Sequence, residues 1–180
     1  SGAGDFNGDG YDDLLIGAPL ASGLTNNKLY SGEVFLVSGT PVPLSGAFDL
    51  AGINGYNGIR FLGATTGDNA GKSVSGLGDI NGDGADDIVV GARGGDGSAD
   101  GRFDAGEAYV VFGVGPGALS LVDLATLNGT NGFAIDSPIG GAALGTSVTG
   151  PGDLNQDGFN DVLVAAPEIS GLGGTRSDSG

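Results

Sequence analysis

The stretch Asp79-Ile80-Asn81-Gly82-Asp83-Gly84-Ala85-Asp86-Asp87 decides the fold of this chain. Oxygen-bearing side chains stand at its first, third, fifth and ninth positions, and a glycine stands at its sixth. The same layout occurs from Asp5 to Asp13 and from Asp153 to Asp161, so each copy begins 74 residues after the last. This spacing predicts a loop that wraps a hard cation, repeated in register along the chain.

Calcium takes six to eight oxygen ligands, and a short loop supplies them when alternate side chains turn inward. The glycine at position six allows the sharp bend that such a loop needs. Position seven contributes a backbone carbonyl, so its side chain is free to vary. The predicted ligands, at positions one, three, five, seven and nine, are Asp5, Asn7, Asp9, Tyr11 and Asp13; Asp79, Asn81, Asp83, Ala85 and Asp87; and Asp153, Asn155, Asp157, Phe159 and Asp161. The prediction is about three calcium ions, one in each loop.

Two other kinds of structure contain loops rich in Asp, Asn and Gly. An EF-hand needs a glutamate at position twelve and flanking helices, but position twelve here is Ile16, Val90 or Val164. Asp, Asn and Gly also form simple tight turns. Three copies in register, each gathering three carboxylates, favour a cation, because it removes the repulsion between them. Asp12, Asp86 and Asn160 at position eight are predicted to face solvent or form turns, and Glu33 and Glu107 to be solvated or structural.

Composition excludes several classes of function. The 180 residues include 40 glycines and no Cys, His, Met or Trp, so disulfides, thiolate sites and ordinary zinc or copper sites are excluded. The net charge of −16 argues against nucleic acid and anionic membranes as partners. No apolar run approaches the length of a membrane helix. No signal peptide or initiator Met is present, and we therefore expect a piece of a longer protein.

The segments around the loops predict short β-strands. Residues 1–4, 72–78 and 146–152 lead into the loops, and the apolar runs 14–19, 88–93 and 162–167 follow them as strands buried on both faces. Each loop therefore connects a β-hairpin. A third strand is predicted at 32–37 and 106–111, after surface loops at 20–31 and 94–105. An outer fourth strand is predicted at 47–50 and 121–124, and a further short strand at 59–62 and 133–136.

The repeat extends beyond the loops, since residues 32–79 align with 106–153 without a gap. About four strands per long repeat, with no helical periodicity, predict an all-β fold of β-propeller blades. The expected units are 1–78, 79–152 and a partial 153–180, all parts of one propeller domain. They amount to about 2.4 repeats, whereas a closed ring needs about four to eight blades. The missing blades are expected from the same longer chain or from neighbouring chains.

The pattern Ser-Val-x-Gly-x-Gly-Asp-x-Asn-Gly-Asp-Gly-x-Asp-Asp-x-x-x-Gly-Ala-Pro resembles the FG-GAP repeat of integrin α-subunits across the whole chain. The resemblance implies about seven blades, calcium in the hairpin between the first two strands of a blade, and an extracellular or cell-surface setting. The chain departs from the pattern at Arg93, Ala165 and Gln156, and Ala70-Gly71 and Leu144-Gly145 stand in place of Phe-Gly. None of these changes removes a predicted ligand. The even, glycine-rich repeats look more like bacterial surface or secreted proteins than animal integrins.

The leading hypothesis is a non-enzymatic, calcium-stabilised extracellular module for surface adhesion, protein interaction or assembly, with a protein or glycan ligand. One alternative is a lectin-like module that binds carbohydrate through its exposed loops. Another is the non-catalytic part of a secreted hydrolase. The residues offer no nucleophile–base pair, and most clustered carboxylates are assigned to ions, so catalysis is not expected.

Overall fold

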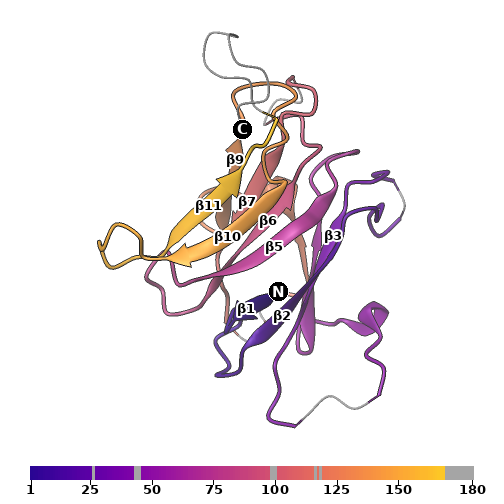
Figure 1. The fold of residues 1–180 in the computed structure, drawn as a ribbon. Coiled ribbons are helices and arrows are strands. Elements are labelled where there is room, and N and C mark those ends of the chain that lie inside the picture. Colours follow the sequence, from indigo (N-terminus) through magenta and orange to yellow (C-terminus); the bar gives the residue numbers. More distant parts are fainter. Residues whose placement is uncertain (26, 43–45, 98–100, 116, 118, 169–180) are drawn as a thin grey trace.

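The computed structural model describes residues 1–25, 27–42, 46–97, 101–115, 117 and 119–168. The architecture is all-β, as predicted, with three sheets stacked face to face (Figure 1). Each sheet is one blade of the β-propeller type and begins at the strand before an acidic loop. Parts of the expected 153–180 unit and of the loops 20–31 and 94–105 lie outside the described residues. No helix in the described ranges is both long and apolar enough to span a bilayer.

Each of the first two blades contains four antiparallel strands, and the third contains a hairpin. The bounds in the first blade are β1 Gly2–Gly4, β2 Asp13–Ala18, β3 Glu33–Val37 and β4 Gly58–Leu62. The bounds in the second blade are β5 Ala70–Gly78, β6 Asp87–Ala92, β7 Glu107–Val111 and β9 Gly132–Asp136. The third blade consists of β10 Ser147–Gly152 and β11 Asp161–Ala165. The predicted strands on either side of each loop, and the predicted third strands, are confirmed.

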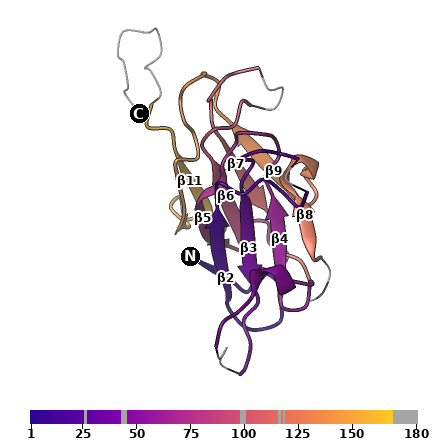
Figure 2. The same cartoon turned by 90° about the vertical axis from the view of Figure 1, so that its right-hand side faces the viewer.

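The predicted outer strands at 47–50 and 121–124 are wrong as fourth strands of their blades. Residues 47–49 form no strand, and the short 3-10 helix η1 Leu50–Gly52 follows, with the Asp49 side chain accepting a hydrogen bond from the Ala51 N–H. In the second copy β8 Leu121–Asp123 does form, but it pairs in parallel with β4 of the first blade before the 3-10 helix η2 Leu124–Thr126 begins (Figure 2). The fourth strands of the two blades are β4 and β9, where a further short strand was expected, and β8 lies outside β4 at the edge of the first sheet.

The core lies between the blades. Successive residues of β6 face opposite sides, so Ile88 and Val90 pack with Phe6 and Phe61 of the first blade, whereas Val89 packs with Val148 of the third. Burial on both faces, predicted for every strand that follows a loop, is therefore confirmed for β6. It is wrong for β2 and β11, where Leu14 and Leu163 are about half exposed because no described element covers their outer faces.

Candidate metal centres

The three acidic loops join the first two strands of their blades, as predicted. They connect β1 to β2, β5 to β6 and β10 to β11, and each pair is antiparallel with a register shift beside the loop. The loops follow one another along one edge of the stack (Figure 1). Strand pairing thus brings the predicted ligands of each loop to the same end of each hairpin.

Glycine conformation accounts for the bend of each loop. The glycine at position six has φ of 91° at Gly10, 92° at Gly84 and 96° at Gly158, beyond the left-handed region that side chains tolerate. Position four is also left-handed, with φ of 66° at Gly8 and 80° at Gly82. Gln156 occupies this position in the third loop at φ 62°, which lies within the left-handed region open to other residues.

The side chains at positions one, three and five turn into the loops and accept hydrogen bonds from backbone N–H groups. The Asp79 carboxylate accepts from Gly82 at 2.7 Å and from Gly84 at 2.9 Å. Asn81 Oδ1 accepts from the Asp83 N–H at 2.9 Å, and Asp83 Oδ1 accepts from the Ala85 N–H at 2.9 Å. The same pattern recurs in the other loops, with position one accepting from positions five and six.

These hydrogen bonds affect the acidity of Asp79. Desolvation raises the pKa, but the backbone N–H groups of the loop, those of Gly84 and Gly82 foremost, together outweigh this and lower the pKa below its ordinary value. The Asp79 carboxylate is therefore held in its charged form, the form that a cation binds.

The aspartate at position nine lies under the loop, in the blade. Asp13 and Asp87 are buried, and each accepts a hydrogen bond at 2.8 Å from an N–H that follows the third strand, that of Gly39 or Gly113. Asp87 Oδ2 also accepts from the Ile80 N–H at 2.9 Å, and Asp161 Oδ2 accepts from the Leu154 N–H at 2.7 Å. Position nine thus ties the loop to the body of the blade.

The first loop differs from the second in the hydrogen bonding of one carboxylate oxygen. Asp13 Oδ2 is buried and accepts no hydrogen bond from any described residue. Burial, together with the charges of Asp9 and Asp5, raises the pKa of Asp13 to about 6, although the neighbouring backbone N–H groups of Gly39 and Asn7 lower it. Burial likewise raises the pKa of Asp87. A buried carboxylate oxygen without a partner, beside two further carboxylates, is a place where a cation would lower the free energy.

The residues therefore fit a calcium ion in their donor chemistry, which consists of carboxylate, amide and backbone oxygens. Within the described ranges, no group of three or more His, Cys, Asp or Glu side chains is gathered tightly enough to hold a metal. The side-chain oxygens that point into the loops accept hydrogen bonds from backbone N–H groups instead. Asn81 Nδ2 also donates a hydrogen bond to Asp83 Oδ2 at 2.8 Å. The ligand roles of the fifteen residues remain a prediction.

Two residues of the acidic loops make contacts that the sequence did not predict. Asp86, predicted to face solvent or form a turn, is half-buried, and its Oδ2 accepts the backbone N–H of Asp5 in the preceding blade at 2.8 Å. Asn7 is buried, and its Nδ2 donates to Ser38 Oγ at 3.2 Å. Asp12, also predicted to face solvent, is exposed. No periodic pattern could indicate the Asp86 contact, because its partner lies 81 residues away in another sheet.

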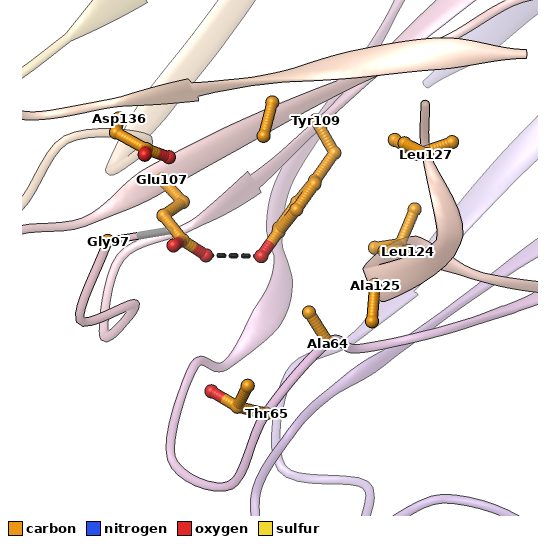
Figure 3. Close-up of a pocket in the computed structure, with 10 residues that line it drawn as sticks. Ala64, Thr65, Gly97, Glu107, Tyr109, Leu124, Ala125, Leu127 and Asp136 are labelled. Carbon is orange, nitrogen blue, oxygen red and sulfur yellow. Dashed lines mark hydrogen bonds between the residues drawn. The ribbon is translucent and has the colours of Figure 1, made fainter. Parts of the chain in front are cut away.

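At the opposite end of the blades, Glu33 and Glu107 are buried, so the structural alternative of their prediction is the correct one. Glu33 pairs with Arg60 at 2.6 Å, and the Arg60 guanidinium lies 5.5 Å from the centre of the Phe35 ring. Ala134 replaces Arg60 in the second blade, where a cavity of about 260 Å³ opens between the blades (Figure 3). Tyr109 donates its hydroxyl to Glu107 there, and burial together with the Glu107 charge raises the pKa of Tyr109.

Stacked blades, two of them four-stranded and one a hairpin, each with an acidic loop in its first hairpin, define a repeat protein of the propeller class. The model of the FG-GAP repeat matches residues 1–37, 70–111 and 144–174, and the chain belongs to this family. It is 34% identical to integrin alpha-V of Gallus gallus over 90% of this chain, and 32% identical to integrin alpha-5 of Xenopus laevis over 91%. It is also 32% identical to integrin alpha-IIb of Homo sapiens over 90%. The chain spans about 14% of the length of each of these relatives.

Proposed function

We propose that this chain is part of a calcium-stabilised extracellular β-propeller that mediates adhesion or protein interaction at a cell surface. The observation that carries the calcium proposal is the buried, unpartnered Oδ2 of Asp13 beside Asp5 and Asp9. Calcium would be held by the oxygens of the three loops, about one ion in each, with the fifteen predicted residues as ligands. Bound calcium supplies positive charge that offsets the clustered carboxylates and ties the first two strands of each blade together.

The proposed role is binding and not catalysis. The similarity to integrin alpha subunits supports an extracellular or cell-surface setting and a protein ligand. The units 1–78, 79–152 and 153–180 would form parts of one propeller, completed by further blades of the same longer chain or of neighbouring chains. The even, glycine-rich repeats favour a bacterial surface or secreted protein.

The proposed binding face lies opposite the acidic loops. The connections from β2 to β3 and from β6 to β7 leave the strands at the other end of the hairpins. They carry apolar side chains that are more than half exposed: Leu20, Leu24, Leu29 and Tyr30 in the first connection, and Phe103 in the second. Exposed apolar side chains on loops are typical of a surface that binds a protein partner.

Calorimetric titration of the chelator-treated protein with calcium tests the metal part of the proposal. About three ions should bind, and Asp5→Asn, Asp79→Asn and Asp153→Asn should each remove one of them. Asp12→Asn, an exposed position in the first loop, serves as the control and should leave the stoichiometry unchanged. Absence of any calcium binding would overturn the proposal.

The adhesive part is tested by binding of the immobilised protein to cell-surface proteins and to a glycan array, each with and without calcium. Protein binding that is lost in Leu20→Ser with Phe103→Ser supports the proposed face. Binding to glycans alone would favour the lectin-like alternative.

A further inference from the structure

The acidic loops of neighbouring blades are in direct contact through position eight. Asp86 Oδ2 accepts the Asp5 N–H at 2.8 Å, and the Asp86 N–H donates to the Asp5 carbonyl at 3.1 Å. Asp5 is the first predicted ligand of the loop before it. A residue of one blade thus fixes both backbone polar groups of a ligand in another, and the contact is half-buried, so solvent competes weakly for it.

The residues around this contact leave room for the Asp86 side chain. A Cβ on Gly4, the residue before the first loop, would lie 1.9 Å from Asp86 Oδ2. Phe6 is held on its other side, where its carbonyl accepts the Val114 N–H of the second blade at 2.9 Å. Asp5 and Phe6 are therefore both positioned by the following blade, and the conformation of the first loop depends on it.

In the next pair of blades an amide side chain lies at the corresponding place. Gly78 precedes the second loop as Gly4 precedes the first, and a Cβ on it would lie 2.1 Å from Asn160 Nδ2 of the third loop. Nothing lies within 4 Å of a Cβ built on Gly152, the corresponding residue before the third loop. At both interfaces between blades, the position-eight side chain of one loop thus lies against the glycine that precedes the neighbouring loop. Asp86 is the charged side chain of the two.

We propose that Asp86 is a positioning residue for the cation of the first loop, acting from the neighbouring blade and coupling the occupancy of the two loops. This inference rests on the proposed calcium function. A cation in the second loop would order that loop and with it Asp86, which then holds the Asp5 backbone in place. The Asp86 charge, close to Asp5, also favours a cation there. By linkage, a cation in the first loop strengthens binding to the second by the same factor.

The first loop carries its own probe. Tyr11 is its position-seven residue, whereas the second and third loops have Ala85 and Phe159 there. The other three tyrosines, Tyr30, Tyr56 and Tyr109, lie outside the acidic loops, and the chain has no Trp. Terbium, a calcium substitute that luminesces when an excited tyrosine lies next to it, therefore reports on the first loop when it is excited through tyrosine. Calcium added afterwards should displace it and quench the signal.

The test compares Asp86→Ala, Asp86→Asn and Asp12→Ala in terbium and calcium titrations of the purified protein. Loss of a residue that orients a metal ligand typically weakens binding about 10- to 100-fold. We expect about a tenfold rise in the half-saturating terbium concentration for Asp86→Ala. The rise should be smaller for Asp86→Asn, whose amide oxygen still accepts the Asp5 N–H, and below about twofold for Asp12→Ala, which removes the same charge from an exposed site.

The outcomes separate the two proposals. Equal affinities for Asp86→Ala and Asp12→Ala, with the wild type binding terbium, would overturn the coupling and leave the calcium function standing. No tyrosine-sensitised signal in the wild type would overturn both. Circular dichroism of each variant at saturating calcium checks the fold. If Asp86→Ala does not fold, the comparison of Asp86→Asn with wild type decides the question, with an unchanged affinity counting against the proposal.

Discussion

Gly17 and Gly71 meet backbone to backbone across the interface between the first and second blades. A Cβ on Gly17 would lie 2.1 Å from the Gly71 carbonyl oxygen. The relationship recurs between Gly91 and Gly145, again at 2.1 Å. Gly17 and Gly91 belong to the Gly-Ala motif after each loop, and Gly71 and Gly145 to the degenerate Phe-Gly element. The two halves of the family signature are therefore in contact between blades, where only hydrogen atoms fit.

Gly17→Ala should separate the first two blades locally. The added methyl group meets backbone atoms that cannot rotate away, and overpacking of this kind costs about 1–3 kcal/mol. Urea unfolding should show this loss, whereas Gly115→Ala, where nothing lies within 4 Å of the new Cβ, should be close to neutral. Equal stabilities of the two variants would show that the blades do not pack as described.

Arg60→Ala should be among the more destabilising substitutions of a charged residue. It leaves the carboxylate of Glu33, which is 3% exposed, without its cation, and breaking a buried pair in this way costs about 3 kcal/mol or more. Arg93→Ala is the matched control, because Arg93 and Glu168 are about half exposed and such pairs contribute less than about 1 kcal/mol. Chemical unfolding curves of both variants test this, and a similar small loss in each would contradict the burial of Glu33.

Positions four and six of the first loop should respond differently to substitution. Gly10 has φ 91°, outside the left-handed region open to side chains, and Gly10→Ala should weaken terbium binding about tenfold through a strain of about 1–2 kcal/mol. Gly8 has φ 66°, close to that of Gln156 in the third loop, so Gly8→Gln should change the affinity much less. Tyr11-sensitised luminescence measures both, and the reverse order of effects would be inconsistent with the loop geometry.

The cation-free protein should gain stability as the pH falls towards 4. Burial raises the pKa of Asp13 from its ordinary value of 3.8 to about 6, so the folded state binds the proton more tightly than the unfolded chain. The resulting stabilisation is complete below about pH 3.8 and is lost as the pH rises through about 6. Calcium competes with this proton, so calcium affinity should rise with pH over the same window.

Urea unfolding in EGTA across this window, on wild type and Asp13→Asn, measures the effect. The variant should lose this part of the pH dependence, and Asp12→Asn should retain it. If the wild type and Asp13→Asn showed the same pH dependence, Asp13 would not be the titrating group.

The strands that flank the loops could be predicted because the information is local. Apolar runs such as 88–93 follow each loop directly, and the exact repeat of the loop pattern fixes the hairpin. The edge of the first blade could not be predicted in the same way. Leu121–Asp123 pairs with β4 from 61 residues away, so its strand signal was assigned to the wrong sheet. Residues 47–49 carry a similar sequence but form no strand.

At the candidate site, too, the contacts within a loop could be predicted and the contacts between distant residues could not. The layout of Asp, Asn and Gly within one loop identified the residues that turn inward, since those contacts span at most five positions. The roles of Asp86 and of Glu33 depend on side chains in another blade or on another strand. A sequence pattern assigns charged residues of this kind to solvent, because long-range burial leaves no local periodicity.

Calcium removal tests the central claim most directly. Thermal unfolding of the purified protein should be followed in excess calcium, in excess magnesium and in EGTA. Calcium at about 100 times its dissociation constant adds about 2.7 kcal/mol per site, which corresponds to a rise in Tm of at least ~5 °C for a domain of this size. Magnesium should raise the Tm less, because it demands a rigid octahedral shell. A melting curve that does not move when EGTA replaces calcium would contradict a calcium-stabilised propeller.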